Sequence, residues 1–439
     1  MLLWQALALY IDNDILLASP IQTLLALQRN LLALAFWSAI GFSALRISAG
    51  FLLAFASGLA LGAVAWRWPY LGEFLQPALS FIKSVPIVCF IVMLLIWFGS
   101  PWVSLAAVFL VAFPSVYFAV LDGLEHRDVK LGEMLDVFDV YGLKKLALYY
   151  WPSLLPFLQV ACKTAIGMSW KSGVAAELIG LPLNSIGERI YRAKILLDSA
   201  DVFAWTATVV SVSILAEFVF FRALNRSDQL AWQLSLAKKS PRVQKTPAPT
   251  DISIRHLNKS YGEKPVLVDL SLELLAGKRY LMNDPSGTGK TTLLRLLLGL
   301  EAFDSGSIVN NNRLAMVFQE PRLFEDKDAL ENLQVIVGKH HDVDTIRLTL
   351  LRLLPEESLA SPVKQLSGGM RRRVELCRAL LAPSQVILLD EPFAGLDAAS
   401  SAMAQELVLS MLDSRSLVVV SHDLDESGLL GLKTVSLVK

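Results

Sequence analysis

Residues 281–294, LMNDPSGTGKTTLL, decide the fold of the C-terminal part of the chain. A short apolar run enters a glycine-containing turn, and KTTLLRLLLGL then continues with helical spacing. This order of strand, loop and helix suits a phosphate-binding loop, G-x-x-x-x-G-K-[ST], in which backbone N–H groups and a helix N-terminus face the phosphates. Gly289, Lys290 and Thr291 match the motif, whereas Asp284 replaces its first glycine. The sequence therefore predicts a nucleotide-phosphate site with one departure from the pattern.

Two buried strands are predicted to deliver the catalytic groups. VILLDE, residues 386–391, ends in Asp390 and Glu391, and LVVVSH, residues 417–422, ends in His422. Asp390 can reach Mg²⁺ directly or through water, and Glu391 can orient or polarise an attacking water. Because phosphoryl transfer depends mainly on positioning and charge neutralisation, this acidic pair favours hydrolysis of a nucleoside triphosphate.

Residues 251–439 resemble an ATP-binding cassette (ABC) domain, which is an α/β fold built around a P-loop. The motifs that carry the resemblance occur in the family's order: the phosphate loop, Gln319 after a strand, LSGG at 366–369, Asp390 with Glu391, and His422. The resemblance implies an ABC-type ATPase whose ligands are ATP and Mg²⁺ and whose ATP hydrolysis is coupled to transport.

The same resemblance implies roles for individual side chains. Tyr261 would stack on adenine, Gln319 would sense the metal and the γ-phosphate, and His422 would contact the γ-phosphate beside the catalytic Glu391. The signature residues Ser367 and Gly369 would complete the ATP site of a second cassette, so hydrolysis would require a dimer. The residues expected at the nucleotide are Tyr261, Ser286, Gly287, Thr288, Gly289, Lys290, Thr291, Thr292, Ser367, Gly368, Gly369 and Asp397, and those expected at Mg²⁺ are Thr291, Gln319 and Asp390.

Hydropathy divides the chain near residue 226. Hydrophobic residues make up 54% of the chain, which is above the usual soluble value, and long apolar runs of about 20 residues each precede this point. We expect a transmembrane permease domain at 1–226, a linker at 227–250 and the ABC domain at 251–439. The 40 basic and 40 acidic residues balance, so the sequence gives no indication of a nucleic-acid partner. The predicted membrane spans, about five all-α helices, are 43–66, 82–99, 102–122, 153–177 and 203–223.

The loop between the third and fourth spans contains DVFDVYGLKKLALYYWPSLLPFL. It resembles the E-A-A-x-x-x-G coupling segment of type I ABC importers. In this interpretation Asp136 takes the glutamate position, Gly142 is the glycine, and Pro152 and Pro156 close the segment. Residues 43–223 also resemble the permeases of nitrate, sulfonate, taurine and thiamine-precursor importers.

The permease resemblance implies an importer in which permease and ATPase are fused. Two copies of the chain would form a homodimer in the lipid of a bacterial cytoplasmic membrane, as a multi-pass protein with its ATPase domain in the cytosol. A separate extracytoplasmic substrate-binding protein would deliver a small-molecule substrate. We expect a small organic or inorganic anion, similar to a sulfonate, taurine or nitrate, or a thiamine precursor.

Intramembrane charges suggest where a substrate could pass. Lys163, Lys171 and Glu177 share one predicted span, and the two lysines, eight residues apart, lie about 80° apart around a helix. A cavity for a small anion is one interpretation, and salt bridges to Glu177 or Glu217, or snorkelling at span ends, are the other.

Two other classes of protein remain open at this stage. A half-exporter also fuses membrane and cassette domains in this order, although its helices extend further into the cytosol. Asp284 alone suggests a catalytically weak regulatory ABC protein, because a carboxylate beside ATP phosphates opposes their binding. We expect Pro285 to keep the backbone at Asp284 extended, so that the carboxylate can point away from the nucleotide.

Overall fold

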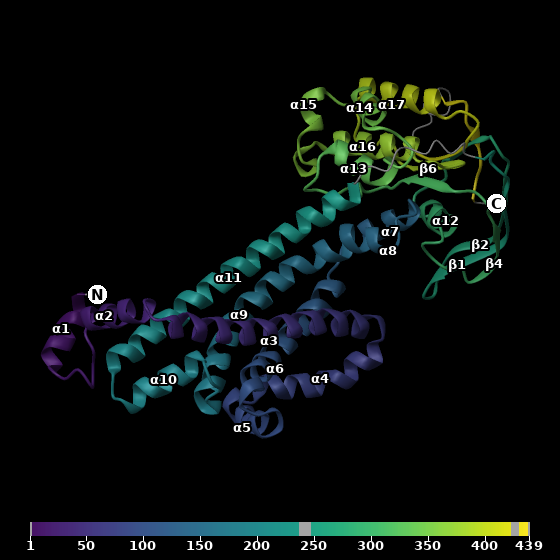
Figure 1. The fold of residues 1–439 in the computed structure, drawn as a ribbon. Helices are drawn as coiled ribbons and strands as arrows, with labels where there is room; N and C mark the ends of the chain where they lie inside the picture. Colours follow the sequence, from purple (N-terminus) through teal and green to yellow (C-terminus); the bar gives the residue numbers. More distant parts are fainter. Residues whose placement is uncertain (1, 237–246, 423–429, 438–439) are drawn as a thin grey trace. The chain divides into compact units, whose positions relative to one another are not determined.

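The computed structural model describes residues 2–236, 247–422 and 430–437. The chain divides into two compact units, Met1–Arg127 with Tyr150–Leu230 and Asp128–Tyr149 with Ala231–Lys439. We call them unit 1 and unit 2. Unit 2 therefore contains both the cassette and the segment 128–149, which sequence alone assigned to the permease (Figure 1).

Unit 1 is all-helical, and its long helices are rich in small and aliphatic residues. Its helices are α1 (Leu2–Ile11), α2 (Pro20–Leu31), α3 (Leu34–Arg67), α4 (Pro69–Ser84), α5 (Ile87–Phe98), α6 (Val103–Glu125), α9 (Trp151–Gly180), α10 (Ile186–Ile195) and α11 (Ser199–Leu236), with a short 3₁₀ turn at Ser100–Trp102.

Three helices in the described part of the chain are long and apolar enough to cross a membrane, namely α3, the helix containing α6, and α11. The pair α4 and α5 adds a fourth candidate, but the two helices meet at 105°, so the predicted span 82–99 is not one straight helix. The break falls at Val85 and Pro86, where proline lacks an N–H donor. Helix α9 contains the fourth predicted span, 153–177, and it is not among the helices that meet the same test of length and composition.

Glycines on α3 allow α3 and α6 to pack closely. A Cβ atom at Gly50 would lie 2.6 Å from the carbonyl oxygen of Leu105, and one at Gly58 would lie 2.9 Å from Val116. Small residues of this kind let helix backbones approach one another where water provides no driving force. Ile47, Val108 and further buried residues from α9 complete this core.

Unit 2 contains two sheets (Figure 1). An antiparallel sheet has the order β2-β1-β4, and a parallel sheet has the order β5-β6-β7-β3-β8. The strands are β1 (Ile252–Tyr261), β2 (Lys264–Leu274), β3 (Arg279–Met282), β4 (Ser305–Val309), β5 (Leu314–Val317), β6 (Val386–Asp390), β7 (Ser416–Val420) and β8 (Lys433–Thr434). The larger helices are α12 (Lys290–Leu297), α13 (Ala329–Val337), α14 (Val343–Leu351), α16 (Gly368–Leu381) and α17 (Ala398–Met411), and α15 (Glu356–Leu359) and a 3₁₀ turn (Val363–Gln365) are shorter.

The parallel sheet positions the predicted catalytic groups. Strands β6 and β7 are buried along their whole length, which explains their uninterrupted apolar sequences. Because parallel strands end at the same edge, the residues that follow β3, β6 and β7 gather there. These residues are the P-loop (284–291), Asp390 with Glu391, and His422.

The predicted linker 227–250 is helical in its first part. Helix α11 continues to Leu236, residues 237–246 lie outside the described ranges, and residues 247–250 are irregular. Trp232 explains why this helix persists, because it is only 6% exposed and its indole N–H donates to Glu331 at 2.9 Å. Its ring also packs edge-on against Phe324 in unit 2. This stretch therefore contributes an anchor to the cassette rather than a free connection.

The segment 128–149 contains α7 (Val129–Val137), α8 (Gly142–Lys145) and the start of a π-helical turn, Leu146–Tyr150. Asp128 caps α7, its side chain accepting from the N–H of Leu131.

Candidate active site

The P-loop adopts the conformation that its glycines permit. Gly287 and Gly289 have φ values of 84° and 91°, which side chains strongly disfavour. A Cβ atom at Gly289 would also lie 2.7 Å from Leu267, so the loop has no room for one there. Lys290 is 6% exposed, and its ammonium donates to the carbonyl oxygens of Asp284 and Pro285. These two hydrogen bonds hold the Lys290 ammonium against the backbone of the loop.

Asp284 directs its carboxylate to the C-terminal segment. The hydroxyl of Ser436 and the backbone N–H of Leu437 both donate to it. Asp284 has a negative φ, so the backbone there does not require a glycine.

Thr291 and Asp390 lie together at the edge of the sheet. The Thr291 hydroxyl donates to Asp390 Oδ2 at 3.0 Å. Burial raises the pKa of Asp390, and the neighbouring Glu391 adds to this, while the Thr291 hydrogen bond opposes it. A hydroxyl and a carboxylate are hard oxygen donors of the kind Mg²⁺ prefers, so these two residues fit the metal.

Glu391 and His422 form the polar wall beside the P-loop. Glu391 has a φ of 51°, an unfavourable conformation for a residue with a side chain, and such strain often marks functional positions. Its N–H donates to the Val420 carbonyl at 2.9 Å, which fixes the strained backbone to β7. The carboxylate is 3.5 Å from His422 Nε2, and this nitrogen is 3.3 Å from the Ser286 hydroxyl. A carboxylate and an imidazole therefore flank the loop.

Gln319 follows β5 as expected, and its side chain is exposed. Its backbone carbonyl accepts a hydrogen bond from Arg372, a buried residue of α16. The backbone of this loop is thus tied to the signature helix.

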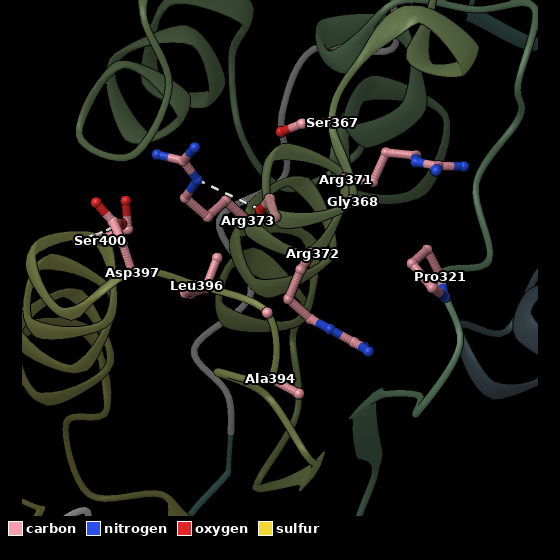
Figure 2. Close-up of a pocket in the computed structure, with 12 residues that line it drawn as sticks. Pro321, Ser367, Gly368, Arg371, Arg372, Arg373, Ala394, Leu396, Asp397 and Ser400 are labelled. Atoms are coloured by element: carbon pink, nitrogen blue, oxygen red, sulfur yellow. Dashed lines mark hydrogen bonds between the residues drawn. The ribbon is translucent and has the colours of Figure 1, made fainter.

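The signature residues line an open pocket (Figure 2). Ser367 caps α16 by accepting from the Met370 N–H at 3.2 Å, and Asp397 caps α17 by accepting from the Ser400 N–H at 3.1 Å. That hydrogen bonding lowers the pKa of Asp397. The pocket has a volume of about 640 Å³, and its lining is Pro321, Ser367, Gly368, Gly369, Arg371, Arg372, Arg373, Ala394, Gly395, Leu396, Asp397 and Ser400. Three arginines and a helix N-terminus suit a phosphate-bearing ligand.

Tyr261 is 48% exposed at the end of β1, which leaves its ring free to stack on a flat ligand. Its hydroxyl donates to Glu301, and Glu301 also accepts from Arg295 Nε. Burial alone would raise the pKa of Glu301, but the hydrogen bonds from Tyr261 and Arg295 and the charge of Arg295 lower it. The ring is thus held by an ionised carboxylate.

We expect Tyr261→Ala to weaken ATP binding about tenfold, since base–aromatic stacking contributes about 1–3 kcal/mol. Tyr261→Phe keeps the ring and loses only the hydrogen bond to Glu301, so its ATP dissociation constant should stay within about threefold of the wild type. Equilibrium binding of a fluorescent ATP analogue to the full chain measures both. Equal losses in the two variants would contradict a stacking role.

Glu133 in α7 makes the main ionic contact between segment 128–149 and the cassette. Its carboxylate accepts from Arg295 at 2.8 and 3.1 Å and from Arg322 at 2.7 Å. All three side chains are at most 22% exposed. Arg295 belongs to α12, the helix that follows the P-loop, and it also holds Glu301. Arg295 therefore contacts both segment 128–149 and Glu301, the partner of Tyr261.

The predicted coupling residues are placed differently from the sequence interpretation. Asp136 pairs with Lys145 at 2.5 Å inside the segment, whereas Glu133, three residues earlier, pairs with Arg295 of the cassette. Asp139 and Gly142 both have positive φ, 55° and 63°. In the E-A-A-x-x-x-G pattern the glutamate lies six residues before the glycine. If Asp139 rather than Gly142 takes the glycine position, the glutamate position falls on Glu133. Pro152 and Pro156 lie in α9 of unit 1.

Sequence reasoning missed Glu133, Arg295, Arg322 and Glu301. Glu133 could have been found from its spacing, because it lies six residues before the turn at Asp139.

Lys163, Lys171 and Glu177, the three residues predicted to lie in the membrane, have different environments on α9. Glu177 is fully buried, and it accepts from the Ser43 hydroxyl at 2.7 Å and from the Gly187 N–H at 3.3 Å. Lys163 and Lys171 are exposed on α9, and neither forms an ion pair within the described residues. The structure thus gives no support for salt bridges from these lysines to Glu177 or Glu217.

Comparison with known proteins gives consistent matches over the C-terminal half. Residues 267–394 match the family model described as ABC transporter. The ATP-binding protein named for aliphatic sulfonates import in Rhodococcus jostii is 40% identical over 190 residues, covering 42% of this chain and 70% of the relative. Its counterpart in Nocardia farcinica is 41% identical over 185 residues, covering 41% of this chain and 74% of the relative. Among solved structures, the dimeric post-hydrolysis state of the ATP-binding cassette MJ0796 bound to ADP and Pi matches at 26% identity with a TM-score of 0.37, covering 40% of this chain and 90% of that one.

Proposed function

Because the chain belongs to the ABC transporter family and its C-terminal half is an ABC importer ATPase, we propose that two copies of it form a complete importer core. Each copy would supply one permease half and one cassette. A separate extracytoplasmic protein would bring the substrate, a small organic anion of the aliphatic sulfonate class. The relatives' names support this substrate class for the ATPase half.

The observation that carries the proposal is the contact of segment 128–149 with the cassette inside unit 2. Glu133 is bound by two arginines, one of them on the helix that leaves the P-loop. A displacement of α12 on ATP binding is thereby transmitted to the segment that leads into the permease helices. This contact supports coupled action of the ATPase and the permease helices.

The chemistry of the site follows from the residues at the sheet edge. Lys290 and the loop N–H groups bind the phosphates, and Glu391 orients water for attack on the γ-phosphate. Mg²⁺, held by Thr291 and Asp390, would supply charge neutralisation when bound. Ser367 and the pocket around it would close the ATP site of the partner copy. ATP binding then draws the cassettes together, and hydrolysis separates them.

Lys163 and Lys171 support an anion pathway. An exposed ammonium facing lipid is costly, so both lysines belong at a water-filled cavity or at a subunit interface. Exposed positions on α9 also include Val160 and Met168, which continue the same face along the helix. A cavity formed between two copies along this face would present four ammonium groups to an anion.

We expect the double variant Lys163→Ala/Lys171→Ala to reduce uptake of a short alkanesulfonate about tenfold or more, because each charge-assisted hydrogen bond contributes about 1.5–3 kcal/mol. ATP hydrolysis without substrate should persist. Lys83→Ala is the matched control, because Lys83 is an exposed lysine of unit 1 that lies over the Phe118 ring. Equal losses in both variants would argue against a pathway along α9.

The proposal is tested by purifying the chain alone into lipid nanodiscs and weighing single particles by mass photometry. Two copies per disc and MgATP hydrolysis that rises on addition of a loaded binding protein are expected. One copy per disc would contradict the proposal. So would a hydrolysis rate that does not change on addition of any binding protein encoded near the gene.

A further inference from the structure

We infer that the segment 435–437 holds the carboxylate that replaces the first P-loop glycine, and that this support keeps the P-loop competent to bind ATP. The inference concerns positioning residues and rests on the ATP site proposed at residues 284–291. If the inference is right, the segment 435–437 affects ATP binding only when residue 284 is an aspartate.

The backbone of this segment lies alongside the entry to the P-loop. Strand β8 pairs in parallel with β3, the strand that leads into the loop, and the N–H of Val435 donates to the Leu281 carbonyl at 2.8 Å. Past the end of β3, the side chain of Asp284 continues this pairing. The Ser436 hydroxyl donates to Oδ1 at 2.5 Å and the Leu437 N–H donates to Oδ2 at 2.9 Å.

Both carboxylate oxygens are therefore satisfied by neutral donors in a place where water has little access. Asp284 is only 7% exposed. A buried carboxylate that lacks donors is strongly unfavourable, and it repels nearby phosphate oxygens because little solvent screens the charge. Hydrogen bonds from Ser436 and Leu437 supply the donors that a buried carboxylate needs, and they keep the Asp284 side chain directed toward β8.

Lys290 makes the position of Asp284 important for nucleotide binding. Its ammonium already donates to the backbone carbonyl of Asp284. If Ser436 and Leu437 no longer donated hydrogen bonds, the Asp284 carboxylate would be free to turn toward the Lys290 ammonium, which already contacts the backbone of Asp284. An ion pair between Asp284 and Lys290 would then compete with the ATP phosphates for the ammonium. A glycine at position 284, as in the motif, has no side chain that could compete.

The test compares how substitutions in the segment 435–437 change the dissociation constant of MgATP when residue 284 is aspartate and when it is glycine. The full chain carries Glu391→Gln so that bound ATP is not hydrolysed, and the dissociation constant of MgATP is measured calorimetrically. Ser436→Ala/Leu437→Pro removes both donors and should weaken binding about tenfold, as expected for lost hydrogen bonds to a charged group. In the Asp284→Gly background the same two substitutions should change the constant less than about twofold.

Three controls keep the result interpretable. Ser436→Thr retains the hydroxyl and should bind ATP like the parent, while Ser436→Ala alone should give a smaller loss than the double substitution. Thermal unfolding shows whether each variant is folded. In the chain with Glu391 intact, the double substitution should raise KM for ATP and leave kcat nearly unchanged.

An equal loss with and without Asp284, or no loss at all, would overturn the inference while leaving the ATP site standing. Absence of ATP binding by the unsubstituted chain would instead contradict the proposed function itself.

Discussion

We expect Glu391→Gln to stop ATP hydrolysis in the purified chain and to leave MgATP binding intact. A positioned general base contributes about 10²- to 10⁴-fold to such a reaction, so kcat should fall by at least the lower of these factors. Glutamine keeps the size of the side chain and the strained backbone at φ 51° but cannot accept the proton of the attacking water. Steady-state phosphate release and equilibrium ATP binding on the same preparation measure the two effects.

Glu406→Gln is the matched control for this substitution. Glu406 is an exposed glutamate of α17, outside the set of residues that meet at the edge of the parallel sheet. Its hydrolysis rate should equal that of the unsubstituted chain. A Glu391→Gln variant that hydrolyses ATP at more than about a hundredth of the normal rate would mean that another group activates the water.

Glu133→Ala is expected to separate hydrolysis from transport. It removes the carboxylate that Arg295 and Arg322 share, and the Arg322 side chain is only 9% exposed. Leaving a buried charge without its partner typically costs about 3–5 kcal/mol, so unit 2 should also unfold at a lower temperature. ATP-driven uptake should fall more than tenfold while hydrolysis in detergent continues, because no group at the sheet edge is altered.

Asp136→Ala provides the comparison, because Asp136 pairs with Lys145 within the segment and is 42% exposed. Its effect on uptake should be small. If Asp136→Ala abolishes uptake and Glu133→Ala does not, the assignment made from the sequence pattern is right and the one made from the contacts fails.

The ionisation of Glu133 gives this contact a pH dependence. Burial would raise the pKa of Glu133, but hydrogen bonds and charge from Arg295 and Arg322 outweigh it and lower the pKa below its ordinary value. A lowered pKa in the folded state adds stability that is fully present above the ordinary pKa and is lost as the pH falls through the lowered value. The stability difference between the unsubstituted chain and Glu133→Ala should therefore shrink on acidification.

The sequence predicted those parts of the site that depend on local motifs. Lys290, Thr291 and Asp390 occupy the places that their motifs assign, since a P-loop and a strand that ends in a carboxylate each need only a few neighbouring residues. Glu391 and His422 lie 3.5 Å apart because β6 and β7, the strands that they follow, are paired neighbours in the parallel sheet. The sequence predicted the two buried strands, and the structure adds their pairing.

Other features depend on contacts that sequence spacing does not report. The partners of Asp284 are Ser436 and Leu437, more than 150 residues away, so its tolerance in the loop could not be explained from the motif. The pattern alone could not choose between Asp136 and Glu133 as the glutamate of the segment, because two positions, Asp139 and Gly142, have the positive φ of the turn. The charged residues of 227–250 led us to expect a linker, and the sequence did not indicate that α11 continues to Leu236. The burial of Trp232, which explains this helix, is evident only in the folded unit.

We propose that this one chain contains both the ATPase and the permease of an importer. Proteoliposomes that contain only the purified chain, loaded inside or outside with MgATP and supplied with a binding protein and a radiolabelled alkanesulfonate, test it most directly. We expect uptake that requires ATP on the cassette side, is lost with Glu391→Gln, and needs no second permease or ATPase chain. Uptake that appears only after another permease subunit is added, or movement of the label in the opposite direction, would contradict the account.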